Sequence, residues 1–179
     1  PNRTQCVQSS ERIQGIRPVP GFIRFEQPEE QNTCLVPLLG FEGNRFYHVF
    51  ESTQPLKDNV FPLVGLPGFR PEFLYVTYLA NESVIKETDS WQRIRFASAN
   101  CPYSALRRLK EIADENPEHY IKIAPIGTRP HCLSAFIFAI VYSDRSEIVY
   151  DHPVSKTGRL GPFRLLRFDY RRLLEVAKS

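Results

Sequence analysis

Two short segments of the chain repeat the pattern Gly-x-x-Gly-x-Arg. They span residues 40–45 (GFEGNR) and 65–70 (GLPGFR), and each follows an apolar run that is typical of a buried strand. Glycine lets backbone N–H groups approach a ligand closely, and arginine offers a two-pronged donor that fits a phosphate group. Residue types at this spacing suit the binding of an anion.

A third segment, residues 125–131 (PIGTRPH), follows another apolar run, and Asp151 and His152 follow a fourth. Open α/β sheets bind ligands at the carboxyl ends of their parallel strands, where helix N-termini add partial positive charge. We therefore expect the loops to form one composite site for a nucleotide-like or other phosphorylated anion. The expected ligand-binding residues are Gly43, Asn44, Arg45, Gly68, Arg70, Asn100, Gly127, Thr128, Arg129, His131, Asp151, His152 and Arg159.

Each group in this site has an expected role. Residues 127–129 and His131 would cradle phosphate, Arg45 and Arg70 would clamp its charge, and Asp151 or His152 would read a sugar or base. A structural explanation stays open for each loop taken alone, because glycines after strands also form tight turns and Asp begins turns before Pro.

The sequence contains few of the motifs that mark catalytic sites. It has no Gly-x-Ser-x-Gly elbow, no phosphate-loop lysine motif and no His-Glu-x-x-His. Glu42, Asp151 and Asp169 could bind a metal, but their spacing does not require one. We expect binding without a metal or cofactor. The alternative is an enzyme that hydrolyses or processes a nucleotide or NAD with His131, Asp151 and His152.

The elements that must position these loops alternate between β-rich runs and helical patterns, which predicts βα units. The expected strands are 34–39, 60–64, 94–97, 120–124, 147–150 and 163–168, and the expected helices are 44–52, 71–86, 102–114, 131–142 and 169–178. A strand remains an alternative for 131–142. Pro37 and Pro62 weaken the first two strands because proline cannot donate to a ladder.

This pattern predicts a Rossmann-like three-layer α/β sandwich with a mainly parallel five- or six-stranded sheet. Residues 1–33 are expected to be an irregular lead-in and 34–179 a single domain, which can be part of a longer chain. Residues 151–159 are expected to form a polar loop.

Composition sets further bounds. The chain has 179 residues, is 42% hydrophobic and carries a net charge of +3, which fits one globular domain and is too mild to indicate a nucleic-acid protein. Its four cysteines form no Cys-x-x-Cys pair, so we expect structural thiols in the cytoplasm. No apolar stretch is long enough to cross a bilayer, so no membrane partner is expected.

The C-terminal tail is basic, with Arg164, Arg167, Arg171 and Arg172. It is expected to be either a solvated face or a contact for nucleic acid.

Residues 121–131 (IKIAPIGTRPH), followed by an apolar helix rich in small residues, resemble the CARF and SAVED group of Rossmann-like sensor domains in prokaryotic antiphage defence. The resemblance extends through Asp151. It implies a strand, a Gly-Gly-Thr-Lys-like turn and a helix that together bind a cyclic nucleotide. Gly127 and Thr128 match the second glycine and the threonine, Arg129 replaces the lysine, and Ile126 stands at the first glycine.

The resemblance implies a ligand sensor that forms a homo-oligomer or an effector subunit. The remaining alternative is a structural subunit of a larger defence complex, in which the apolar helix and the basic tail serve assembly.

Overall fold

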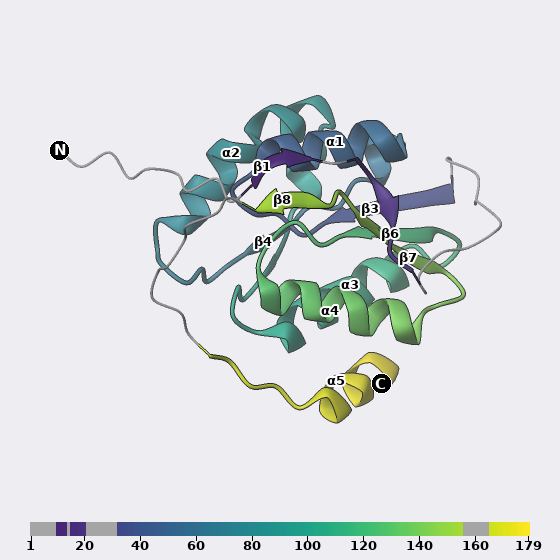
Figure 1. Ribbon diagram of the computed structural model, residues 1–179. Helices are drawn as coiled ribbons and strands as arrows, with labels where there is room; N and C mark the ends of the chain where they lie inside the picture. The colour runs from purple at the N-terminus through teal and green to yellow at the C-terminus, as the bar shows by residue number, and fades with distance from the viewer. Residues whose placement is uncertain (1–9, 14, 21–31, 156–164) are drawn as a thin grey trace.

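The computed structural model describes residues 10–13, 15–20, 32–155 and 165–179 (Figure 1). Its strands are β1 (Ser10–Ile13), β2 (Arg17–Pro18), β3 (Thr33–Pro37), β4 (Leu63–Gly65), β5 (Arg95–Ala97), β6 (Tyr120–Ala124), β7 (Ser146–Tyr150) and β8 (Pro153–Ser155). Its α-helices are α1 (Gly43–Thr53), α2 (Phe73–Glu87), α3 (Pro102–Glu115), α4 (Arg129–Val141) and α5 (Tyr170–Lys178). Strands and helices alternate from β3 to β7, which confirms the α/β class.

The parallel strands form two groups. One sheet has the order β2-β7-β6-β3, in which β7, β6 and β3 are parallel and β2 is antiparallel to β7. The other group is the parallel pair of β4 and β5. Isolated parallel bridges, Leu35 with Val60 and Leu38 with Leu63, join β3 to the segment around β4. The described strands do not form the expected mainly parallel sheet of five or six strands.

Pro37 accounts for the break between the two groups. The Phe61 amide donates to the Leu35 carbonyl at 2.9 Å, and the Leu39 amide donates to the Leu63 carbonyl at 2.8 Å. A continuous ladder would need a donor at position 37 between these bonds, and proline has no N–H. The proline that the sequence flagged therefore interrupts the pairing of β3 with β4.

Helices cover both faces of the strands (Figure 1). The helices α1 and α2 lie on one face, whereas α3 and α4 lie on the other, with α5 packed outside them. Strand side chains alternate between two cores, as the pleat requires. Leu35 and Leu39 pack toward α1 and α2, and Val36 and Leu38 pack toward α3 and α4.

The helix expected at 131–142 is α4, so its strand alternative is wrong. One side of α4 packs on β7, and α3 and α5 pack against it as well, which explains why its sequence is apolar nearly all round. Among the described residues, no helix is both long and apolar enough to span a bilayer.

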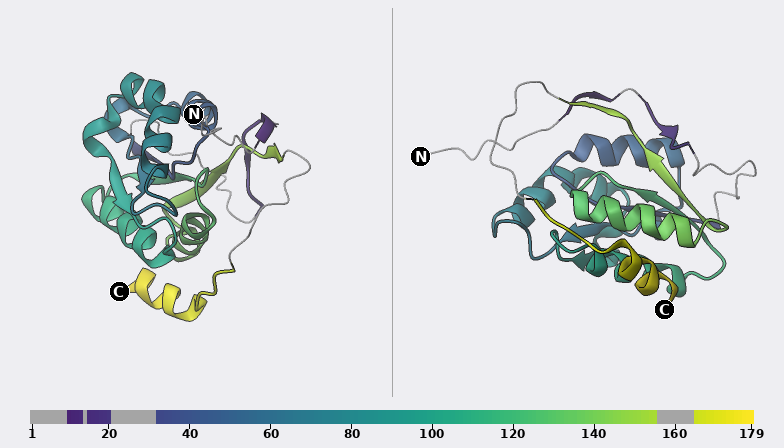
Figure 2. Two further views of the ribbon diagram at one scale, coloured as in Figure 1. Left: turned by 90° about the vertical axis from the view of Figure 1, so that its left-hand side faces the viewer. Right: turned by 60° about the horizontal axis from the view of Figure 1, so that its bottom comes forward.

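The two ends of the chain depart from expectation. The lead-in contributes β1 and β2, and the segment expected to be a polar loop contains β8, which pairs antiparallel with β1. Figure 2 shows the β1–β8 pair at one side of the molecule, away from α2 and α3. Residues 165–168 are not a strand, since no described strand pairs with them. Residues 163 and 164 lie outside the described part.

Three cysteines in the described part are free thiols: Cys34, Cys101 and Cys132. Cys34 is completely buried in the core beneath α3 and α4, and burial raises its pKa to about 12 despite the opposing charge of Arg145. It therefore behaves as a small apolar side chain, as expected.

Candidate functional site

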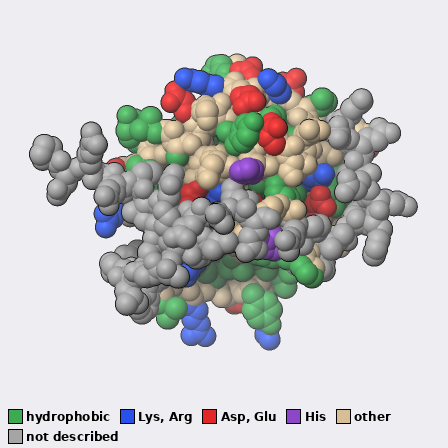
Figure 3. All heavy atoms as spheres, turned by 45° about the horizontal axis from the view of Figure 1, so that its top comes forward, with side chains coloured by type: hydrophobic (Ala, Val, Ile, Leu, Met, Phe, Trp, Pro, Cys, Tyr) green, Lys and Arg blue, Asp and Glu red, His purple; other side chains and the backbone are tan. Residues whose placement is uncertain are grey.

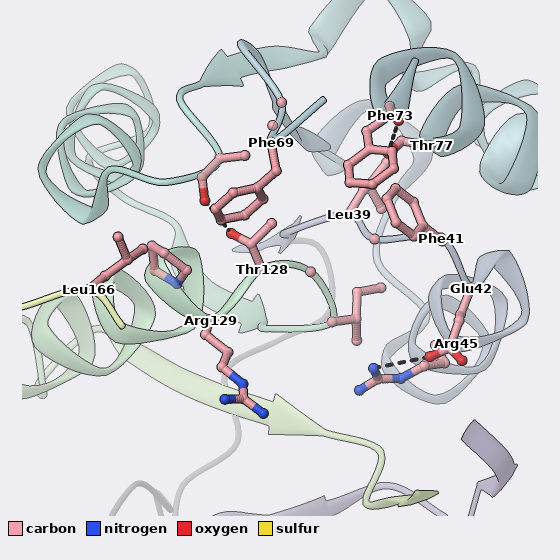
Figure 4. Close-up of a pocket in the computed structure, with 17 residues that line it drawn as sticks. Leu39, Phe41, Glu42, Arg45, Phe69, Phe73, Thr77, Thr128, Arg129 and Leu166 are labelled. Carbon is pink, nitrogen blue, oxygen red and sulfur yellow. Dashed lines mark hydrogen bonds and ion pairs between the residues drawn. The ribbon is translucent and has the colours of Figure 1, made fainter. Parts of the chain in front are cut away.

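A cavity of about 620 Å³ opens at the carboxyl ends of the parallel strands (Figure 4). This volume lies within the range of small-molecule sites, roughly 300–1,000 Å³. The lining residues come from the end of β4, from the loops after β3, β4, β5 and β6, from α1, α2 and the start of α4, and from the C-terminal segment: Leu39, Gly40, Phe41, Glu42, Arg45, Gly65, Gly68, Phe69, Phe73, Thr77, Ala99, Ile126, Gly127, Thr128, Arg129, Pro130 and Leu166. Both Gly-x-x-Gly-x-Arg loops and the Ile126–Pro130 segment thus converge.

The floor of the cavity depends on two glycines that face each other. A Cβ at Gly40 would lie 2.6 Å from the Ile126 carbonyl oxygen, and a Cβ at Gly127 would lie 2.6 Å from the Leu39 carbonyl oxygen. Only glycine permits this approach of the loops after β3 and β6. Asn81 of α2 fixes one of them, since its side-chain amide donates to the Gly40 carbonyl at 2.8 Å.

Arg45 lines the cavity but is already paired. Its Nε and one terminal nitrogen donate to the two carboxylate oxygens of Asp151 at 2.7 and 2.6 Å, and Glu42 lies 3.5 Å from its other terminal nitrogen. Burial by itself lowers the pKa of Arg45, but hydrogen bonding and the charges of Asp151 and Glu42 raise it overall. The pair ties the start of α1 to the end of β7.

The start of α4 presents few free backbone donors. Thr128 is the N-cap, and its hydroxyl accepts from the His131 amide at 3.4 Å and donates to the Ala99 carbonyl at 2.9 Å. Pro130 has no N–H. The amides of Thr128 and Arg129 remain, together with the exposed guanidinium of Arg129, which forms no ion pair with any described carboxylate. An anion at this end would rely chiefly on the Arg129 side chain.

His131 lies behind the cavity wall. It is fully buried, and its Nε2 lies 3.0 Å from the Ser98 carbonyl oxygen. Because a carbonyl only accepts, Nε2 carries a proton. The buried Nδ1 has no hydrogen-bond partner, so a second proton there would have no acceptor, which favours the neutral ring. Burial lowers the pKa of His131, against the opposing effect of this hydrogen bond. The side chain therefore braces α4 against the loop after β5.

Three phenylalanines form an apolar end of the cavity that the sequence prediction missed. Phe41 and Phe73 meet edge to face with ring centroids 4.9 Å apart, and Phe69 is 44% exposed. In Figure 4 these rings gather at one end, and the guanidinium groups of Arg45 and Arg129 lie at the other. Phe41 and Phe69 occupy variable positions of the two Gly-x-x-Gly-x-Arg loops. Their aromatic side chains were the feature of the sequence that could have indicated an apolar end of the site.

The remaining expected residues of the described part lie off the cavity lining. Gly43 packs against α2, since a Cβ there would lie 1.7 Å from the Ala80 carbonyl oxygen. Asn44 and Asn100 are exposed, and Arg70 stacks its guanidinium 5.8 Å from the Phe73 ring centroid. His152 follows Asp151 with a φ of 43° and contacts the Tyr150 ring. Arg159 lies outside the described residues.

In the described part of the chain, no cluster of three or more metal-ligating side chains occurs. Glu42 and Asp151 both engage Arg45, and Asp169 caps α5 by accepting from the Arg171 amide at 2.9 Å. The described atoms over α1 and α2 show acidic and basic side chains intermixed with apolar ones (Figure 3). The described side chains over α1 and α2 thus form no broad basic surface.

No protein-family model matches this chain, and no match was found among curated proteins. The site is therefore interpreted from its own residues.

Proposed function

We propose that this domain senses a nucleotide-like or other phosphorylated anion by binding it, unchanged, in the cavity at the carboxyl ends of its strands. The observation that carries the proposal is the Arg129 guanidinium, which pairs with no described carboxylate and lies at one end of a glycine-floored cavity of about 620 Å³. Arginine binds phosphate through several charge-assisted hydrogen bonds, and a helix N-terminus adds to the local positive potential.

Binding is favoured over catalysis because the candidate catalytic groups are occupied or inaccessible. Asp151 and His131 are both 0% exposed; the first is held by Arg45 and the second by the Ser98 carbonyl. A general base must reach the proton that it removes, directly or through one water. A nucleotide-processing enzyme built on these two side chains would need them to leave their present partners.

The sensing role, the setting in prokaryotic defence and an oligomeric or effector-linked assembly are proposed from the resemblance of residues 121–151 to CARF and SAVED domains. The identity of the bound ligand decides whether these parts of the proposal are correct. Nucleic acid at the basic tail remains a separate prediction.

Equilibrium binding to a nucleotide panel tests the proposal. The Arg129→Ala variant should lose at least tenfold in affinity, and Arg107→Ala is the control, because Arg107 is exposed on α3 outside the cavity. Equal affinity of wild type and Arg129→Ala would refute it. Product analysis after incubation should return the ligand intact, whereas turnover would favour the enzyme. If no small anion raises the thermal stability, the structural-subunit alternative is favoured.

A further inference from the structure

The cavity has two chemically different ends, and a phosphate group would occupy only one of them. The polar end holds the Arg129 guanidinium, and the other end is walled by Phe41, Phe69 and Phe73 (Figure 4). A free phosphate ion would leave the aromatic end unused. The shape of the site therefore indicates a ligand with an apolar group attached to its anion.

The aromatic end is arranged as a slot. Phe69 lies on one side and the edge-to-face pair of Phe41 and Phe73 lies on the other (Figure 4). The backbone positions Phe69, since the Leu66 amide donates to the Ala97 carbonyl at 2.7 Å and the Ala99 amide donates to the Pro67 carbonyl at 3.0 Å. With 44% of its surface exposed, Phe69 has ring area available to a ligand.

Polar groups that could read the edge of a base are scarce at this end. The Thr77 hydroxyl lines the cavity but already donates to the Phe73 carbonyl at 2.8 Å. Stacking on phenyl rings needs no specific edge, because every nucleobase has a π-face. The aromatic end therefore suits a flat ring more than a sugar, whose hydroxyl groups would lose their hydrogen bonds to water.

We infer that the ligand carries a flat aromatic ring joined to one anionic group, as a nucleoside monophosphate does, with its ring held between Phe69 and the Phe41–Phe73 pair. This inference rests on the proposed function for the anion and adds the ring and its seat. Stacking of one base on an aromatic side chain contributes roughly tenfold to a hundredfold in affinity.

Calorimetric titration of the 179-residue chain with adenosine 5′-monophosphate, ribose 5-phosphate and adenosine tests the ring and the anion separately. The monophosphate should bind at least tenfold more tightly than ribose 5-phosphate. Phe69→Ala should remove this preference and leave the affinity for ribose 5-phosphate unchanged. Phe96→Ala is the matched control, because Phe96 is 39% exposed and lies outside the cavity lining.

Failure of the inference can be told apart from failure of the proposed function. Equal binding of the two phosphates, or no effect of Phe69→Ala, overturns the aromatic seat and leaves the anion site standing. Adenosine binding as tightly as its monophosphate overturns the anion site instead. Binding of neither phosphate overturns both.

A pair of smaller probes separates a flat ring from a merely apolar group. Phenyl phosphate and cyclohexyl phosphate have similar size, but only the first can stack. Tighter binding of phenyl phosphate, lost in Phe69→Ala, supports the inference. Equal or tighter binding of cyclohexyl phosphate overturns it.

Discussion

Arg45 and Asp151 are separated by 106 positions in the sequence, and their side chains form a buried two-pronged ion pair with bonds of 2.6 and 2.7 Å. The pair joins the first turn of α1 to the residue that follows β7. Arg45 also contributes to the cavity wall, so the same contact that holds these elements together sets one side of the candidate site.

Replacing Asp151 with Ala should lower the free energy of unfolding by about 3–5 kcal/mol, because it leaves the Arg45 guanidinium buried without its main partner. Urea denaturation followed by circular dichroism measures the change. Asp114→Ala serves as the control, since Asp114 is exposed on α3 and should shift stability by less than about 0.5 kcal/mol. A comparably small effect of Asp151→Ala would contradict a structural role for the pair.

Replacing Gly43 with Ala should force α1 and α2 apart, because the added methyl group would lie 1.7 Å from the Ala80 carbonyl oxygen. Overpacking of this kind costs roughly 1–3 kcal/mol or more. The midpoint of urea unfolding should fall accordingly. Asn44→Ala, at the exposed neighbouring position in the same turn, should unfold near the wild-type midpoint. If both variants match the wild type, the helices are not in such close contact.

His131 should make the protein less stable as the pH falls through about 6.5, the ordinary pKa of histidine in the unfolded chain. Burial lowers the pKa of His131 in the folded state, so the unfolded chain takes up the proton first. The stabilisation is fully present above pH 6.5 and is lost between that value and the lower folded pKa.

The measurement is the free energy of unfolding at pH 7.0 and 5.5 for wild type, His131→Gln and His48→Gln. Glutamine at 131 can keep a donor for the Ser98 carbonyl but cannot titrate. His131→Gln should lose less stability than the wild type between the two pH values. His48→Gln is the control for removing a histidine at an exposed position. An unchanged slope in His131→Gln would show that the ring protonates freely in the fold.

Truncating Leu173 to Ala should cost about 2–5 kcal/mol, because the side chain is 0% exposed in the core that α5 shares with α3 and α4. Leu165→Ala, at an 88% exposed position of the same tail, is the matched control. Thermal melts of both variants distinguish a docked helix from a loose tail. Equal melting temperatures would mean that α5 detaches from the domain in solution.

Local patterns in the sequence were sufficient to place the main elements. The helical pattern of residues 102–114 predicted α3, and the apolar run at 131–142 predicted α4, with a strand as its alternative. These signals act within a few turns of chain, so periodicity can detect them. The sequence indicated that Pro37 weakens its strand, because a missing donor is a property of the residue itself, but it did not distinguish Pro37 from Pro62 or place the interruption.

Properties that depend on contacts between distant residues could not be read in this way. Nothing in the sequence says that Arg45 meets Asp151 or that His131 is buried beneath Ser98. The pairing of β1 with β8 brings together segments from opposite ends of the chain, so no local pattern marks it. Of the expected ligand-binding residues, those that line the cavity are Arg45, Gly68, Gly127, Thr128 and Arg129.

The interrupted ladder at Pro37 lies between the two strand groups whose loops wall the cavity. Gly40 and Gly127 follow β3 and β6 in one group, whereas Gly65 and Gly68 belong to β4 and the loop after it in the other. The amides of Phe61 and Leu39 still cross the interruption, so a few hydrogen bonds set the distance between the two walls. The width of the cavity therefore depends on contacts between strands as well as on the loops that line it.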